Sequence, residues 1–161
     1  MTAPQSHLEE GLKLTADAEV DLFEIILRNL PVTYRFRDGA TVTWQGNVYE
    51  TMACHLSGDM QSADGEEARP LLRIMNPLGI FNEAVINGDI DLAVVKRKRL
   101  LRAHLDADTN IFDQRMWYIS RPRELISGQS LSLELRSMSE GAAFQIPVRI
   151  YMPPEFPFVT I

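Results

Sequence analysis

The sequence Thr41-Val-Thr-Trp-Gln-Gly-Asn-Val-Tyr49 predicts a β-hairpin. β-Branched and aromatic residues, which favour strands, stand on both sides of Gln45-Gly46-Asn47. Glycine accepts the positive φ angles that tight hairpin turns require. We therefore expect one strand at Thr41–Trp44 and its partner at Val48–Met52.

Two further strands are predicted before this hairpin. Val20–Leu27 is rich in β-branched and aromatic residues, as a buried strand is. In Val32–Phe36, apolar and polar residues alternate with the period of two of a half-buried strand. Asp38-Gly39 then supplies a turn. Together with the hairpin, these strands predict an antiparallel meander.

A strand followed by a helix is predicted after a polar, acidic loop at residues 58–68. Pro70–Met75 has strand composition. Asn76 can cap a helix and Pro77 suits its first position, which predicts one short helix at about residues 78–86. Gly88 is suited to the left-handed residue that follows a helix.

The rest of the chain continues the β pattern. Leu92–His104 is compatible with a helix or a strand, and the alternation after Val94-Val95 favours the strand. Further strands are expected at Arg115–Ser120, Leu131–Arg136 and Gln145–Met152. The expected fold is a mainly-β, single-domain antiparallel β-barrel or sandwich with one short helix. We place the β domain at residues 15–152, between a flexible or partner-dependent arm at 1–14 and an extended arm at 153–161.

Composition excludes several classes of protein. The 161 residues are 45% hydrophobic and 24% charged, as in a globular chain and unlike a disordered one. A net charge of −6 argues against a general nucleic-acid binder. No apolar run approaches the roughly 20 residues that span a bilayer. The polar, acidic start predicts no signal peptide and synthesis in the cytoplasm.

The sequence Asp106-Ala-Asp108-Thr-Asn110 resembles the start of a calcium-binding loop. Such a loop needs a glycine at its sharp turn and a bidentate glutamate at its end, but Ile111 and Trp117 stand at those positions. An ordinary polar loop is therefore expected.

Cys54-His55 is the one pairing that suggests a nucleophile beside a base. Neighbouring residues on a strand point to opposite faces, so these two side chains cannot share a proton. A single cysteine also forms no intramolecular disulfide and no cysteine-based metal site. We predict no catalytic residues, no metal and no cofactor, and the protein is not expected to be an enzyme.

The densest charge feature is Lys96-Arg-Lys-Arg99. On a strand, the two lysines point to one face while Arg97 and Arg99 point to the other. Three interpretations stay open for this run: contact with acidic groups of a neighbouring subunit, a solvated edge strand that resists aggregation, or the lining of a DNA channel. Arg97 and Arg99 are the candidate interface residues.

The segment Pro153-Pro-Glu-Phe-Pro-Phe158 places aromatic side chains between stiff prolines. Such an arm can lie in a groove of a neighbour with little loss of entropy, or it can pack over the end of its own domain. Pro154, Phe156 and Phe158 are the candidate contact residues.

Several groups of residues occur in an order and spacing that point to one known family. They are Val20–Leu27; Val42-Thr43-Trp44-Gln45-Gly46 with Tyr49; Arg69-Pro70, Ile74, Asn76, Leu78 and Val85; Val94-Val95, Arg97-Lys98 and Leu105-Asp106; Leu131–Arg136; and Gly141 with Val148–Met152. Taken together they resemble the N-terminal domain of the minor tail protein L family of long-tailed bacteriophages. Full-length members of that family continue into a cysteine-rich domain resembling an iron–sulfur module, and this chain has Cys54 alone.

The resemblance implies a structural protein of the virion, assembled in the host cytoplasm. It would form a homo-oligomeric ring, with threefold symmetry, in the tail tip or baseplate hub. Its partners would be other tail-tip proteins, the distal tail tube and the central receptor-binding fibre, with no membrane and no sequence-specific nucleic acid. Two alternatives stay open: a sixfold distal-tail or connector ring, and a non-viral β-barrel module that binds a small ligand.

Overall fold

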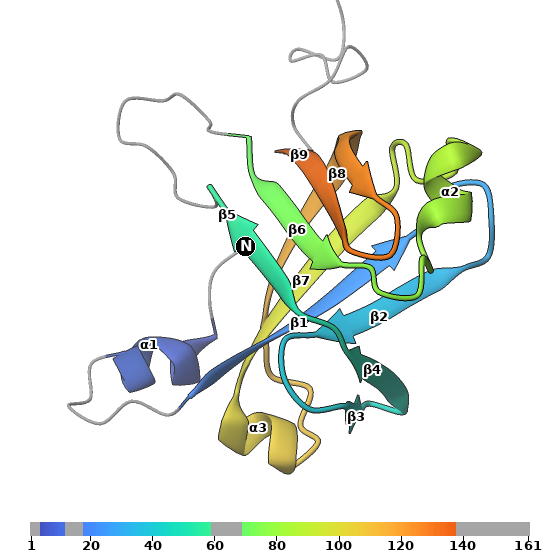
Figure 1. Cartoon of the computed structure of the whole chain (residues 1–161). Coiled ribbons are helices and arrows are strands. Elements are labelled where there is room, and N and C mark those ends of the chain that lie inside the picture. Colours follow the sequence, from blue (N-terminus) through green and yellow to red (C-terminus); the bar gives the residue numbers. More distant parts are fainter. Residues whose placement is uncertain (1–3, 12–17, 59–68, 138–161) are drawn as a thin grey trace, which may run out of the picture.

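Strands dominate the part of the chain that the computed structural model describes, which is residues 4–11, 18–58 and 69–137 (Figure 1). The helices in these ranges are α1 (Gln5–Gly11), α2 (Asn82–Ile86) and α3 (Arg102–Asp106). The strands are β1 (Glu19–Ile26), β2 (Thr33–Arg37), β3 (Val42–Trp44), β4 (Asn47–Thr51), β5 (Cys54–Ser57), β6 (Leu71–Met75), β7 (Val94–Leu101), β8 (Asp113–Ile126) and β9 (Ser130–Ser137). The predicted mainly-β class is confirmed.

These strands form one sheet in the order β3-β4-β2-β1-β7-β8-β9-β6-β5. The chain passes from β4, near one edge, to β5 at the other edge through Met52-Ala53. There the Met52 N–H donates to the Arg37 carbonyl at 2.9 Å, and the Met75 N–H donates to the Ala53 carbonyl at 2.8 Å. This short link draws the two ends of the sheet together, so the sheet folds over on itself.

The folded sheet encloses the main core as a β-sandwich, and it does not close into a barrel. Figure 1 shows β5 and β6 crossing in front of β1 and β7. Phe23 and Phe36 from one half pack with Leu72 and Leu133 from the other. Phe81, just before α2, closes one end, with its ring centroid 6.3 Å from that of Phe36. Burial of these apolar side chains is the main force that holds the two halves together.

A second, smaller core lies on the opposite face of β1 and β7. The β3–β4 hairpin and α3 cover it, and its buried residues are Leu22, Trp44, Tyr49, Leu100 and Leu105. The hairpin predicted at residues 41–52 therefore exists, and it turns through Gln45 and Gly46, both with positive φ. Its function in the fold is to bury aromatic side chains against α3.

The predicted antiparallel meander is wrong in one respect, because the sheet is mixed. β2 and β4 pair in parallel, with Phe36 opposite Glu50 and Arg37 opposite Thr51. After β2 the chain runs outward through the Asp38-Gly39 turn, and β4 returns beside β2 while β3 forms the outer strand. In a plain meander, β3 would lie next to β2. Here β4 lies next to β2, and the burial of Trp44 and Tyr49 in the second core stabilises this arrangement.

The helix expected at about residues 78–86 exists but begins at Asn82. Gly79 has φ +66°, a left-handed conformation that a helix cannot contain. Asn76 is fully buried and does not cap a helix at Pro77; its side-chain amide donates to the Asn82 Oδ1 at 2.9 Å. This bond stabilises a turn before the helix. Two other short helices, α1 and α3, were not predicted.

Other observed boundaries of helices and strands differ from the predicted ones by a few residues. Leu92–His104 contains both alternatives, since β7 ends at Leu101 and α3 follows directly. The strand expected at Arg115–Ser120 is the first half of the longer β8. The predicted strand at Gln145–Met152 and the arm at 153–161 lie outside the described residues.

Candidate functional site

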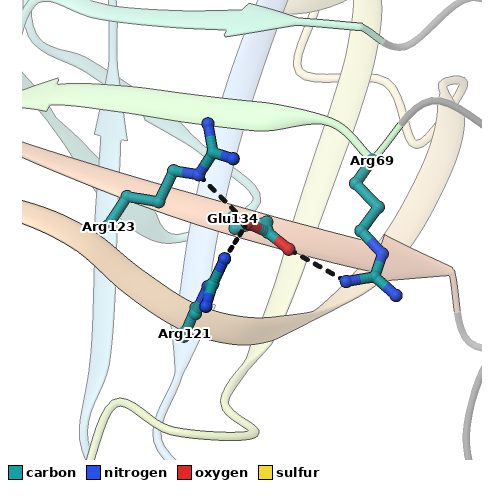
Figure 2. A network of polar contacts seen from close by, with 4 residues as sticks. All are labelled: Arg69, Arg121, Arg123 and Glu134. Atoms are coloured by element: carbon teal, nitrogen blue, oxygen red, sulfur yellow. Dashed lines mark hydrogen bonds and ion pairs between the residues drawn. The ribbon is translucent and has the colours of Figure 1, made fainter.

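Three arginines converge on one glutamate on the outer face of β6, β8 and β9 (Figure 2). The Glu134 carboxylate accepts from Arg69 Nη1 at 3.1 Å and from Arg123 Nε at 3.0 Å. Arg121 Nη2 lies 3.4 Å from the same Oε2 that Arg123 contacts. Figure 2 shows the guanidinium groups reaching Glu134 from different sides. We call Arg69, Arg121, Arg123 and Glu134 the arginine cluster.

The position of Glu134 follows from strand alternation. Leu133 and Leu135 point into the main core, so Glu134 between them points outward. Its exposed fraction is nevertheless only 5%, because the long arginine side chains cover it. An outward carboxylate is thereby removed from water and held by cations.

A β-bulge brings Arg121 and Arg123 to the same face. Ile119 pairs with Leu135 and points into the core, so a regular strand would also direct residues 121 and 123 inward. The register shifts between Ile119 and Arg121, and again between Pro122 and Glu124. Arg121 therefore lies opposite Glu134. Re-aiming side chains is a common effect of bulges, which also accommodate proline within a strand.

The electrostatics of the arginine cluster favour anions. Hydrogen bonding from Arg69, reinforced by Arg121 and Arg123, outweighs burial and lowers the pKa of the Glu134 carboxyl below its usual value. Three guanidinium groups share this one carboxylate, so Glu134 does not fully neutralise Arg121 and Arg123. The arginine side chains are 57%, 66% and 57% exposed, in the order Arg69, Arg121, Arg123.

A pocket of about 400 Å³ lies at this cluster. Its lining residues are Arg69, Leu71, Arg121, Arg123 and Glu134. Guanidinium groups bind carboxylates and phosphates through paired N–H donors in one plane. The pocket thus has the chemistry of an anion-binding site, and its one carboxylate, Glu134, is already bound by the arginines.

A second carboxylate, Glu24, is buried beneath the β3–β4 hairpin. The Tyr49 hydroxyl donates to it at 2.6 Å and the Lys98 ammonium at 2.8 Å. Burial alone would raise the pKa of Glu24, but these two hydrogen bonds lower it overall. Burial and the bond to Glu24 also raise the pKa of Tyr49. With Glu24 6% exposed and Tyr49 fully buried, this group stabilises the second core and is not open to a ligand.

The basic run lies on β7 with the predicted alternation. Lys98 points to the second core, while Arg97 and Arg99 turn to the other face toward Asp21. Arg99 binds the Asp21 carboxylate through Nε and Nη2, at 2.9 and 3.2 Å. Arg97 is 5% exposed, and its guanidinium carbon lies 5.7 Å from the ring centroid of Trp117. Both candidate interface residues are therefore paired within their own chain.

The loop that resembles a calcium site has a different role. Asp108, with φ +49°, accepts a hydrogen bond from the Gln45 backbone N–H at 2.7 Å. The Trp44 indole N–H donates to the Thr109 carbonyl at 3.1 Å. These bonds join the loop to the turn of the β3–β4 hairpin. Across the described ranges, no three His, Cys, Asp or Glu side chains gather as metal ligands do.

Cys54 and His55 diverge on β5, as strand geometry requires. Cys54 packs against the main core, and His55 is exposed. Burial, with Asp38 and Asp21 nearby, raises the pKa of the Cys54 thiol to about 12. The thiol is protonated at neutral pH and is a poor nucleophile.

The structure also brings together residues whose proximity the sequence does not indicate. The rings of His7 and His104 stack at 6.3 Å between α1 and α3. The arginine cluster joins Arg69 to Glu134, 65 positions apart, through strands β6 and β9 that lie side by side. The one part of this cluster that is local in the sequence is Arg121-Pro-Arg123. Its position beside Glu134 cannot be predicted without knowing the bulge in β8. Pro154, Phe156 and Phe158 lie outside the described residues.

Exposed apolar side chains gather near α2. Leu78 is 84% exposed and Ile86 78% exposed, with Ile80 between them in sequence at 37%. Contiguous exposed apolar patches are a common feature of surfaces that bind other proteins. We call Leu78, Ile80 and Ile86 the apolar end.

No protein-family model matches this chain, and no curated protein matches it either. Within residues 4–11, 18–58 and 69–137, no helix has the length and apolar character needed to cross a membrane.

Proposed function

We propose that this protein is a structural subunit of a phage tail tip. In this role it is a minor tail protein that forms a ring and connects the distal tail tube to the central receptor-binding fibre. It acts by assembly and involves no chemical reaction. The proposal rests on the resemblance to the minor tail protein L family, and three features of the structure support it.

The main support is that two of the family-like segments meet in space. Trp44 and Tyr49 belong to one segment and Leu105 to another, and all three are buried in the second core. The bonds from Trp44 to Thr109 and from Gln45 to Asp108 join the hairpin to the loop that directly follows Leu105-Asp106. Segments that pack against each other in the fold have a structural reason to occur together in one sequence. Short matches that arise by chance would have no such reason.

The second support is the character of the surface. The apolar end exposes Leu78 and Ile86 almost completely, and the arginine cluster exposes Arg121 and Arg123 on the outer face of the sheet. Subunits that lie between several neighbours need surfaces of this kind. Apolar contacts contribute affinity, and complementary charges fix how two neighbours are aligned.

The third support is the charge state of two carboxylates, Glu24 and Glu134, that are bound by cationic side chains. Glu24 and Glu134 have lowered pKa values because of their hydrogen-bonded cations. A general acid or base works best with a pKa near the operating pH. Both carboxylates are instead fixed in the charged form, which suits a structural role.

An averaged electron-microscopy reconstruction of the phage particle, with the symmetry tested at the distal end of the tail, tests this proposal. Density for this fold in a threefold ring on the tail axis is the expected result. A sixfold ring would keep the protein in the virion but move it to a distal-tail or connector position. A virion without such density would contradict the proposal and favour a small-ligand-binding module.

A further inference from the structure

We infer that the arginine cluster is a docking site for carboxylate side chains of an acidic segment in a partner protein. This inference names the chemistry of a partner and does not depend on the tail-tip role. Arg121 and Arg123 share the single carboxylate of Glu134, and both arginine side chains are more than half exposed.

The donors of Arg123 are only partly used by Glu134. The bond to Glu134 is made by Nε, on the inner side of the guanidinium group. Figure 2 shows one Nη nitrogen of Arg123 pointing away from Glu134. A guanidinium group has five N–H donors in a plane, and its two Nη groups can hold both oxygens of a second carboxylate while Nε stays bound to Glu134.

The cluster is also preorganised. Arginine side chains lose considerable conformational freedom when a ligand immobilises them, and this loss opposes binding. Here the 5%-exposed Glu134 already restrains Arg121 and Arg123 before any ligand arrives. An incoming anion therefore meets donors that are already restrained near one another.

The pocket favours an acidic side chain over a bare ion. Leu71 lines it together with the arginines. A glutamate or aspartate side chain has methylene groups that can contact Leu71 while its carboxylate meets Arg121 or Arg123. The volume of about 400 Å³ suits one or two such side chains.

A nucleic acid fits this site less well. Single strands bind through basic grooves that carry aromatic side chains for base stacking, and none of the five lining residues is aromatic. The net charge of −6 also repels an extended polyanion over the rest of the chain. A short acidic segment needs only the local arginines.

Fluorescence anisotropy with labelled hexaglutamate, at low salt and with the full chain, tests this inference. The comparison probes are neutral hexaglutamine and an oligothymidylate of the same charge as hexaglutamate. We expect hexaglutamate to bind and hexaglutamine not to bind. Combined Arg121→Gln and Arg123→Gln substitution should weaken binding about tenfold or more, since charge-assisted bonds are lost.

Two further variants control for net charge and for folding. Combined Arg28→Gln and Arg102→Gln removes the same charge from exposed sites elsewhere, and it should leave binding within about twofold. Combined Arg121→Lys and Arg123→Lys keeps the charge beside Glu134, which protects folding, but loses the planar donors. It should still weaken binding about threefold.

Three outcomes would overturn the inference. One is that hexaglutamate does not bind the wild-type chain. Another is that the Arg121 and Arg123 variants bind it as tightly as the wild type does. The last is that oligothymidylate binds more tightly than hexaglutamate and depends on the same arginines, which would make the cluster a nucleic-acid site.

Discussion

The carboxylate of Asp108 accepts a hydrogen bond from the backbone N–H of Gln45 at 2.7 Å, across 63 positions of sequence. Both residues have positive φ, 49° and 50°. The bond joins the turn of the β3–β4 hairpin to the loop after α3, and so closes the second core over Trp44 and Tyr49.

Asp108→Ala should lower the free energy of unfolding by about 1–2 kcal/mol. The substitution removes the acceptor and places alanine in a left-handed conformation. Asp108→Asn is the matched control, since asparagine keeps an oxygen acceptor and tolerates this conformation; it should cost less than about 0.5 kcal/mol. Urea unfolding followed by tryptophan fluorescence measures both, and equal losses would contradict the role of the bond.

Lys98→Met should destabilise the protein by about 3 kcal/mol, because it leaves the buried Glu24 carboxylate without its closest cation. Tyr49→Phe removes one hydrogen bond to the same carboxylate and should cost about 1–2 kcal/mol. Thermal unfolding of both variants gives the comparison. A smaller loss for Lys98→Met than for Tyr49→Phe would show that the lysine is not the main partner.

Stability should fall in acid. Glu24 and Glu134 have folded-state pKa values below the value of 4.5 expected in the unfolded chain. Their stabilisation is therefore fully present above pH 4.5 and is lost as the pH falls through the lower folded-state values. Urea midpoints measured over a pH series should show this decline. The combined variant Glu24→Gln and Glu134→Gln should decline less steeply; an identical decline would assign the effect to other groups.

Arg97→Glu should destabilise the protein by about 3 kcal/mol, because it places a carboxylate at a position 5% exposed and close to Asp21. Arg97→Met keeps an apolar side chain over Trp117, and Asp21 retains Arg99. This control should cost about 1 kcal/mol. Thermal unfolding checks both values. Full stability of Arg97→Glu would mean that Arg97 is open to solvent and available to a partner.

Leu78→Asp combined with Ile86→Asp should leave the free energy of unfolding within about 0.5 kcal/mol, since both side chains are exposed. If the apolar end is an assembly surface, the variant should be incorporated into phage tails much less than the wild type. Val48→Asp, at a site 53% exposed on β4, is the control. Immunoblotting of purified particles measures incorporation, and normal incorporation of the double variant would exclude this surface.

Local pattern was enough to predict most of the strands. The alternation in Val32–Phe36, the composition of Val20–Leu27 and the glycine turn at Gly46 each depend on neighbours in sequence. The opposite directions of Lys98 and Arg97 follow from strand geometry alone, and the structure confirms them. The same holds for Cys54 and His55. These features need no information about distant residues, because the period of a strand is a property of its backbone.

The candidate site, in contrast, depends on tertiary structure. Arg121 faces Glu134 only because a bulge inserts one residue into β8, and Arg69 reaches Glu134 only because β6 pairs with β9. The parallel pairing of β2 with β4 is likewise set by the burial of the hairpin against α3. Pairing partners and bulges are decided by the packing of side chains that are distant in sequence. The sequence therefore determined which residues form strands, and the packing of those strands decided which charges meet.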